Sequence, residues 1–240
     1  MKEFGALIFD VDGTMAETEE LHRRAFNECF ARFGLDWTWD TDLYARLLRI
    51  TGGKERIAHF VDQYRRAQYA LSAADIVELH KMKNRRYAEL LADGHCPLRP
   101  GVADVIELAK SRGQRLAIAT TTSRSNVDAL LSPIMGNTWP DVFHAVVAGE
   151  DVERKKPAPD AYFKAVESLG LPAQACLAFE DSRNGLLAAQ AAGVPVVITR
   201  SMYFGDEDFE GAFAVVDDLA EFLDSPHKPS AGEIAAGKLL

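Results

Sequence analysis

The sequence predicts an α/β protein built on a doubly wound parallel sheet, and three observations support this. The first is a set of short runs that are apolar on both faces, as in parallel strands covered by helices; they are Ala6–Phe9, Leu116–Ala119, Phe143–Val147, Cys176–Phe179, Val196–Thr199 and Ala214–Val216. The second is the helical pattern between most of these runs. The third is a long helical stretch between the first run and the second. The expected fold is a Rossmann-like core with an inserted α-helical domain.

The helices predicted for the core have apolar residues at spacings of three and four, and each stops at a glycine. They cover residues 102–109, 162–169 and 186–192, ahead of Gly113, Gly170 and Gly193. Strand and helix therefore alternate along this part of the chain, as a parallel sheet requires.

The inserted domain is predicted from three apolar stripes with helical spacing: Leu21, Ala25, Cys29 and Phe33; Ile57, Phe60, Val61 and Tyr64; and Ile76, Leu79, Tyr87 and Leu90. Its entry is Thr14–Thr18 and its exit is Asp93–Pro100, which contains glycine and proline. We expect residues 1–14 and 93–224 to form the catalytic core, residues 15–92 a helical cap, and residues 225–240 a C-terminal tail.

Composition is that of an ordinary globular protein and excludes several classes of function. Hydrophobic residues make up 48% and charged residues 26% of the 240 residues, and the formal net charge is −9. This charge argues against a general nucleic-acid-binding protein. No run approaches the roughly 20 apolar residues that cross a bilayer. The three cysteines include no CxxC pair, so neither a disulfide framework nor a zinc site is predicted. We expect a cytoplasmic monomer with no nucleic-acid or membrane partner.

A pair of acids follows the first predicted strand. The segment Asp10-Val11-Asp12-Gly13-Thr14 places two carboxylates at the carboxyl end of a parallel strand, where open α/β sheets bind ligands. One carboxylate can ligate a hard cation or attack phosphorus, and the other can exchange a proton with the leaving oxygen. A helix-capping or turn role is the structural alternative. A calcium-binding EF-hand loop is excluded, because its first ligand position would fall on Ile8.

Hydroxyl groups follow the second predicted strand. Thr120, Thr121, Thr122 and Ser123 open a predicted helix, and hydroxyls with backbone N–H groups at a helix N-terminus can bind an anion. A simple helix cap is the alternative.

A lysine and a second acid pair complete the set. Pro157 biases Lys156 to an extended backbone, which presents an ammonium suited to phosphate oxygens. Its neighbour Lys155 is interpreted as an ordinary surface lysine. Glu180 and Asp181 end the strand Cys176–Phe179 and can complete a magnesium site with Asp10; capping the next helix is the alternative. The order of acids, hydroxyl, lysine and acids at successive strand ends favours one shared site.

These residues resemble the motifs of the haloacid dehalogenase superfamily, in its phosphatase and phosphomutase branch with a helical cap. The resemblance covers the chain from about Ala6 to Phe222. It implies catalytic roles for Asp10 as nucleophile, Asp12 as general acid and base, and Thr120 and Lys156 as groups that hold the phosphoryl group, with Thr121 and Thr122 beside them. It also implies Mg²⁺ held by Asp10, the backbone carbonyl of Asp12, and Asp181 with help from Glu180. Asp12 favours phosphoryl transfer, because dehalogenases lack this second acid.

Specificity is expected to come from the cap. Gly52 and Gly53 let the backbone approach a ligand closely, and Lys54 and Arg56 add positive charge opposite the catalytic site. The segment is not a Walker A loop, because it lacks the first glycine and the Ser/Thr. Glu17 and His22 resemble cap-entry positions that contact the substrate.

The substrate is predicted from a closer resemblance within the superfamily. Trp39, Asp40 and Tyr44, followed by 51–56 (Thr-Gly-Gly-Lys-Glu-Arg), resemble the CbbY-type group, which is related to β-phosphoglucomutase. The resemblance implies a Mg²⁺-dependent sugar-phosphate phosphatase acting through an aspartyl phosphate. The implied substrate is xylulose-1,5-bisphosphate, a Rubisco inhibitor in the Calvin cycle, with Tyr44 among the substrate-binding residues. A phosphomutase, a phosphatase for another small sugar phosphate or phosphoglycolate, and a non-catalytic sugar-phosphate-binding protein are the alternatives.

Overall fold

The computed structural model describes residues 1, 3–65, 71–94 and 96–224, so the predicted tail over 225–240 lies outside the described residues. The core is a six-stranded sheet in the order β3-β2-β1-β4-β5-β6, with every neighbouring pair parallel. The strands are β1 (Ala6–Phe9), β2 (Arg115–Ala119), β3 (Ala145–Val147), β4 (Cys176–Glu180), β5 (Val196–Thr199) and β6 (Ala214–Val216). The predicted α/β class is confirmed.

One predicted strand is too long at its start. Phe143 and His144 precede β3, which begins at Ala145. Phe143 follows the 3₁₀ helix η2 (Trp139–Val142), and its ring packs edge-on against Trp139 at 6.1 Å between centroids. Phe143 is thus buried in the core cluster without being part of the strand, a role that an apolar run does not distinguish from a strand position.

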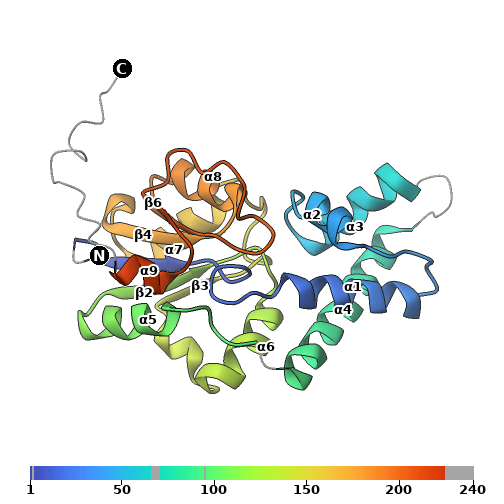
Figure 1. Cartoon of the computed structure of the whole chain (residues 1–240), viewed down its shortest axis with the longest axis horizontal. Coiled ribbons are helices and arrows are strands. Elements are labelled where there is room, and N and C mark those ends of the chain that lie inside the picture. The colour runs from blue at the N-terminus through green and yellow to red at the C-terminus, as the bar shows by residue number, and fades with distance from the viewer. Residues whose placement is uncertain (2, 66–70, 95, 225–240) are drawn as a thin grey trace.

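Helices cover both faces of the sheet, because alternate strand residues point to opposite sides. Leu7 and Phe9 of β1 pack with α5 (Val102–Ser111), α6 (Arg124–Met135) and α9 (Leu219–Asp224). Ala6 and Ile8 face the other way and pack with α7 (Asp160–Leu169) and α8 (Arg183–Ala191). Figure 1 shows α7 and α8 on one side of the sheet and α5 and α9 on the other. A short 3₁₀ helix, η3 (Ala173–Ala175), leads into β4.

The stretch between β1 and β2 begins with helices, as predicted. They are α1 (Glu19–Arg32), α2 (Thr41–Leu47), α3 (Gly53–Phe60), which continues into the π-helical turn η1 (Val61–Arg65), and α4 (Ala73–Asp93). Their apolar faces form a separate buried cluster with many aromatic rings, including Phe26, Phe30, Trp37, Trp39 and Phe60. Figure 1 shows these helices beside the sheet rather than over either face. The division at residues 15–92 remains a prediction, and these four helices are called the cap below.

The two connections between cap and core run side by side. The backbone N–H of Arg99 donates to the carbonyl of Met15 at 2.8 Å. The Arg99 guanidinium donates to the carbonyls of Gly13, Arg200 and Asp217, the last at 2.8 Å. The Arg99 side chain, which is 9% exposed, therefore joins both cap connections to the ends of β5 and β6.

No helix among the described residues is long and apolar enough to span a membrane.

Candidate active site

The site begins at the carboxyl end of β1, near the centre of the sheet. Asp10 follows β1 directly, and its backbone N–H donates to the carbonyl of Phe179 in β4 at 3.0 Å. Its side chain is buried. The sheet ladder therefore holds this carboxylate between the ends of β2 and β4, where a doubly wound fold places its ligands.

Lys156 lies between three strand ends. Its ammonium donates to Oδ1 of Asp10 at 2.6 Å, to Oε1 of Glu180 at 2.5 Å and to the carbonyl of Ala119 at 2.8 Å. These acceptors stand at the ends of β1, β4 and β2, and they use all three N–H groups. Burial alone would lower the pKa of Lys156, but the charges of Asp10 and Glu180 outweigh burial and raise that pKa above its ordinary value. The site therefore contains a fixed positive charge.

Three buried acids cluster here, and two of them accept from this lysine. The pKa of Asp10 is raised to about 8, chiefly by burial; Lys156 opposes the shift and Glu180 adds to it. Burial, followed by the charges of Asp10 and Glu180, also raises the pKa of Asp181 well above its ordinary range. Carboxylates in this arrangement repel one another, so full ionisation requires more positive charge than Lys156 supplies.

The acids fit a hard cation. Carboxylate oxygens of Asp10, Glu180 and Asp181 lie within 4.8 Å of one another. Oδ2 of Asp181 is buried and has no hydrogen-bond partner among the described residues. Gly13 leaves room for it, since a Cβ there would lie 1.9 Å from that oxygen. An unpartnered oxygen in an all-oxygen cluster matches the ligand preference of Mg²⁺.

The Glu180 carboxylate accepts more hydrogen bonds than the carboxylate of Asp10 or Asp181. Its Oε1 accepts hydrogen bonds from Lys156 and from the Tyr162 hydroxyl, the latter at 2.6 Å. Its carboxylate also packs against Gly185 of α8, where a Cβ would lie 2.0 Å from Oε2. The geometry makes Glu180 an orienting partner of Lys156, and it leaves Asp10 and Asp181 as the acids with oxygen available to a cation.

Asp12 faces the cap. Its Oδ1 accepts from the Thr18 hydroxyl at 2.5 Å and contacts Nε2 of His22 at 3.1 Å. Nδ1 of His22 in turn lies 2.7 Å from the ammonium of Lys83 on α4. Burial lowers the pKa of Lys83 to about 7. In its charged form the Lys83 ammonium can only donate, and in that state Nδ1 accepts and Nε2–H donates to Asp12. Burial alone would raise the pKa of Asp12, but His22 and Thr18 outweigh it and hold that pKa below its ordinary value.

The predicted hydroxyl segment reaches the same place from β2. The backbone N–H of Thr120 donates to Val147 of β3 at 2.9 Å, and the N–H of Thr122 donates to the Thr120 hydroxyl at 3.3 Å. Ser123 is the N-cap of α6, but its hydroxyl makes no cap hydrogen bond. It accepts instead from Asn84 of α4 at 3.0 Å. The segment therefore contacts the cap as well as opening a helix.

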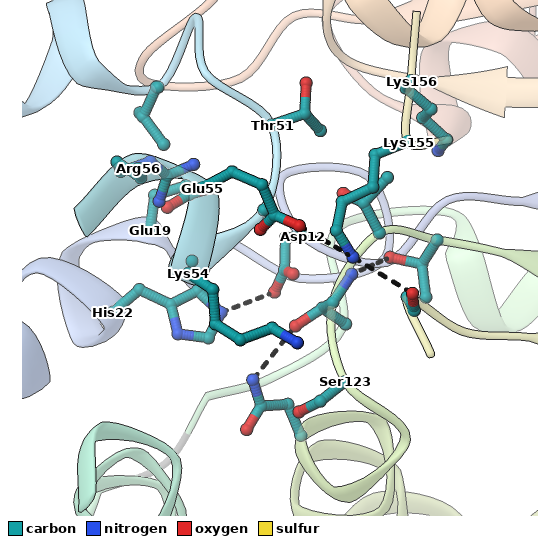
Figure 2. Close-up of a pocket in the computed structure, with 18 of the residues that line it drawn as sticks. Asp12, Glu19, His22, Thr51, Lys54, Glu55, Arg56, Ser123, Lys155 and Lys156 are labelled. Atoms are coloured by element: carbon teal, nitrogen blue, oxygen red, sulfur yellow. Dashed lines mark hydrogen bonds and ion pairs between the residues drawn. The ribbon is translucent and has the colours of Figure 1, made fainter. Parts of the chain in front are cut away.

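One pocket between cap and core collects most of the predicted residues. From the core it is lined by Asp10, Asp12, Thr120, Thr121, Thr122, Lys156, Glu180 and Asp181, and from the cap by His22, Gly52, Gly53, Lys54 and Arg56. Figure 2 shows His22 pointing at Asp12, with Lys54 and Arg56 on the cap side.

Two predicted substrate-binding residues lie outside this lining. Glu17 is exposed, and its carboxylate lies 3.5 Å from Nε of Arg99 in the second cap connection. Tyr44 is fully buried in the aromatic cluster of the cap. Its hydroxyl donates to Glu19 at 2.7 Å and accepts from Arg56 at 3.2 Å. Tyr44 thus contacts two lining residues from behind.

The interpretation of Lys155 as a surface lysine is wrong. Its side chain lines the pocket, donates to the carbonyl of Gly149 at 3.0 Å and lies 3.7 Å from Glu55 of the cap (Figure 2). Its stem passes Gly52, where a Cβ would lie 2.7 Å from Cδ of Lys155. The absence of a side chain at Gly52 is what lets a core lysine cross to the cap.

Other lining residues were not anticipated from the sequence: Glu19, His80, Lys83, Asn84, Asn126 and Asn184. Lys83 is only 3% exposed. Asn184 donates to the hydroxyl of Thr51 at 3.2 Å, which is a further contact between core and cap. Apart from the helical spacing of Lys83 and Tyr87, the sequence carries no pattern that separates these polar residues from surface residues.

Comparison with known proteins identifies the family of this chain. The sequence model of haloacid dehalogenase-like hydrolases matches residues 4–193. The chain belongs to this family. Among family members, Protein CbbY of Rhodobacter capsulatus is 53% identical over 218 residues, which cover 91% of this chain and 95% of that protein.

Two further haloacid dehalogenase-like relatives are informative. A crystal structure of a CbbY mutant from Rhodobacter sphaeroides in complex with xylulose-(1,5)bisphosphate matches with a TM-score of 0.86 and 46% identity, over 91% of this chain and 96% of that one. Fructose-1-phosphate phosphatase YqaB of Escherichia coli is 30% identical over 83% of this chain and 98% of that protein. The predicted family, and the prediction of a phosphatase, are confirmed.

Proposed function

We propose that this protein is a Mg²⁺-dependent phosphatase that forms an aspartyl phosphate on Asp10 and acts best on xylulose-1,5-bisphosphate. The observation that carries the proposal is the position of Asp10, which lies 2.6 Å from a buried ammonium and within a cluster of acids that fits a cation. A carboxylate can approach a negatively charged phosphoryl group only where positive charge surrounds it.

In the first step a carboxylate oxygen of Asp10 attacks phosphorus, and the bond from phosphorus to the sugar oxygen breaks. Lys156 donates to Asp10 and lies at the ends of three strands, so it is placed to neutralise charge on the transferring group. The Thr120 hydroxyl and the N–H of Thr121 supply further donors. Protonated Asp12 donates its proton to the departing sugar oxygen.

In the second step a water molecule attacks the same phosphorus, and the bond to Asp10 breaks. Asp12 removes a proton from this water, which requires its ionised form. The low pKa of Asp12, set by His22 and Thr18 against burial, provides that form. Before the first step, the negative charge of the bound phosphate raises the pKa of Asp12 and favours its protonation.

Mg²⁺ would be held by Asp10, Asp181 and the backbone carbonyl of Asp12. When bound, it supplies positive charge that offsets the repulsion between the acids and the phosphate. The unpartnered Oδ2 of Asp181 supports this assignment.

Mg²⁺ affinity should rise with pH. The pKa of Asp10 is raised to about 8, so below that pH the carboxyl holds a proton that a cation must displace. Each protonated ligand acid contributes up to about tenfold per pH unit, so affinity should rise with pH over the range in which Asp10 and Asp181, whose pKa is also raised, lose their protons. Calorimetric titration in buffers of different ionisation enthalpy measures the proton released. The Asp10→Asn variant should release fewer protons, and an affinity independent of pH would contradict the assignment.

The cap side of the pocket suits a second phosphate. Lys54 of α3 lines the pocket opposite the acids, together with Arg56. Lys155 reaches the same space from the core and lies 3.7 Å from Glu55. Cations on both sides favour a ligand with an anionic group at each end. The relative solved with a sugar bisphosphate supports this choice.

Lys54→Ala should weaken the bisphosphate far more than a small monophosphate. Losing a charge-assisted hydrogen bond to the second phosphate should raise KM for xylulose-1,5-bisphosphate about 10- to 100-fold. Turnover of p-nitrophenyl phosphate, which has no second phosphate, should change less than about twofold. Lys110→Ala, an exposed lysine of α5 paired with Glu107, is the control. Equal losses on both substrates would contradict a role in binding the second phosphate.

The proposed reaction is tested by incubating the protein with Mg²⁺ and xylulose-1,5-bisphosphate and measuring free phosphate alongside sugar products. Stoichiometric phosphate release is expected. Isomerisation of β-glucose 1-phosphate without phosphate release would establish the phosphomutase alternative instead.

A further inference from the structure

A core loop that follows β5 reaches into the cap. Within it the N–H of Gly205 donates to the carbonyl of Ser201 at 3.0 Å, and the Arg200 guanidinium donates to the carbonyl of Gly205. Arg99 of the second cap connection holds the carbonyl of Arg200 at 2.5 Å. The loop is therefore closed by its own hydrogen bonds and anchored at its base.

Tyr203 is the residue through which this loop contacts the cap. Its ring packs edge-on against Tyr44, with 5.6 Å between centroids and 81° between planes. Its hydroxyl donates to Glu20 of α1, and with Phe204 it packs against the aromatic cluster of the cap. Tyr203 itself lies outside the lining of the main pocket. Its contacts are therefore with the cap, not with a ligand at Asp10.

Tyr44 connects Tyr203 to two residues that line the pocket, Glu19 and Arg56. Its hydroxyl donates to Glu19 at 2.7 Å and accepts from Arg56 at 3.2 Å, and the Arg56 guanidinium lies 5.3 Å from the centre of its ring. Burial raises the pKa of Tyr44 well above its ordinary value, so the hydroxyl keeps its proton and remains a donor. Nε of Arg56 is fixed by the carbonyl of Leu47 at 3.2 Å.

Glu19 and Arg56 share the Tyr44 hydroxyl at the wall of the pocket. Both line it, and Figure 2 shows them on the cap side, away from Lys156. Glu19 offers carboxylate acceptors for sugar hydroxyls, and Arg56 offers fixed donors for hydroxyl or phosphate oxygens. A substrate recognised by this pair is therefore a polyhydroxylated phosphate that extends beyond the reacting phosphoryl group.

We propose that Tyr203 is a positioning residue, which fixes the Glu19–Arg56 pair through Tyr44 and so sets affinity for the sugar part of the substrate. This inference rests on the proposed sugar-phosphate function. It joins a loop of the catalytic core to the recognition wall of the cap, so the pair reaches its binding geometry only when cap and core are docked. A purely structural role for Tyr203 would instead affect every substrate alike.

The test compares Tyr203→Ala with Tyr203→Phe, and uses Met202→Ala as the control because Met202 is 70% exposed on the same loop. Loss of the ring contact should raise KM for xylulose-1,5-bisphosphate about three- to tenfold, with kcat nearly unchanged. Tyr203→Phe keeps the ring and should retain most of the affinity. Turnover of p-nitrophenyl phosphate should stay within about twofold in all three variants. An equal loss on both substrates overturns the proposal.

A double-mutant cycle tests the route through Tyr44. In a Tyr44→Phe background the hydroxyl that holds Glu19 and Arg56 is gone, so adding Tyr203→Ala should cost less than about twofold. The same loss as in the native background means that Tyr203 acts by another route, and the proposal fails.

The proposed function and this inference fail in different ways. Absence of turnover of xylulose-1,5-bisphosphate by the unmodified protein contradicts the function alone. The inference has a readout without substrate, which is hydrogen exchange of backbone amides in the first turn of α3. Exchange should be faster in Tyr203→Ala than in Tyr203→Phe or Met202→Ala. Unchanged exchange overturns the inference whichever sugar phosphate is turned over.

Discussion

Asp10→Asn should abolish turnover, with a loss of kcat of about 10⁴-fold or more. The amide has nearly the same shape as the carboxylate, but it cannot attack phosphorus. Radiolabel from the phosphate of a substrate should attach to the native protein and not to this variant. Because the change removes a buried acid whose pKa is raised to about 8, the variant should also remain folded.

Thermal unfolding distinguishes loss of chemistry from loss of structure. The midpoint for Asp10→Asn should lie close to that of the native protein, since Asn can still accept from Lys156. Turnover above about one per cent of the native rate in a preparation free of deamidation would remove Asp10 from the role of nucleophile.

Lys156→Met should lower both activity and stability. The ammonium is 4% exposed and donates to Asp10, Glu180 and the carbonyl of Ala119. Without it two buried acids lose their counter-ion, and breaking a buried pair in this way costs about 3–5 kcal/mol of the free energy of unfolding. The loss of a preorganised donor should reduce kcat by a further factor of about 10²–10³. Denaturant unfolding and steady-state kinetics measure the two effects.

A second substitution separates these two effects. Adding Glu180→Gln to Lys156→Met removes one of the stranded charges, so part of the lost stability should return while activity stays low. Lys110→Met, at an exposed pair on α5, controls for the loss of a lysine as such. Full activity in Lys156→Met would show that the positive charge is dispensable.

The core of the fold follows from local pattern. Runs such as Ala6–Phe9 are apolar on both faces because helices cover both sides of the sheet, and this property can be recognised without a structure. The polar residues after these strands converge because parallel strands all end at the same edge. Asp10, Thr120, Lys156 and Asp181 were accessible to prediction for that reason, although their roles remain proposals.

The contacts between cap and core could not be predicted in the same way. Lys155 stands in a charged segment next to Lys156, and only the passage of its stem beside Gly52 places it in the pocket. Lys83 sits on a helix among other charged residues, and its burial depends on packing against α1. Such contacts join residues far apart in sequence, so no local periodicity encodes them.

Tyr44 illustrates a third limit of prediction from the sequence. A resemblance in sequence marked it as a substrate-binding residue, whereas the structure places its hydroxyl behind the pocket wall, between Glu19 and Arg56. Resemblance of a motif indicates that a residue matters near a site. It does not tell whether the side chain meets the ligand or supports one that does.

The meeting of the two cap connections at Met15 and Arg99 has a consequence for how such proteins diversify. With the two chain segments one hydrogen bond apart, the intervening stretch leaves and re-enters the sheet at a single point. A replacement of almost any length, even a tight turn, closes the same gap without stretching the backbone. Recombination can then replace the cap, and with it the residues that recognise the substrate, as one unit. The reacting acids and their lysine stay where the strands hold them.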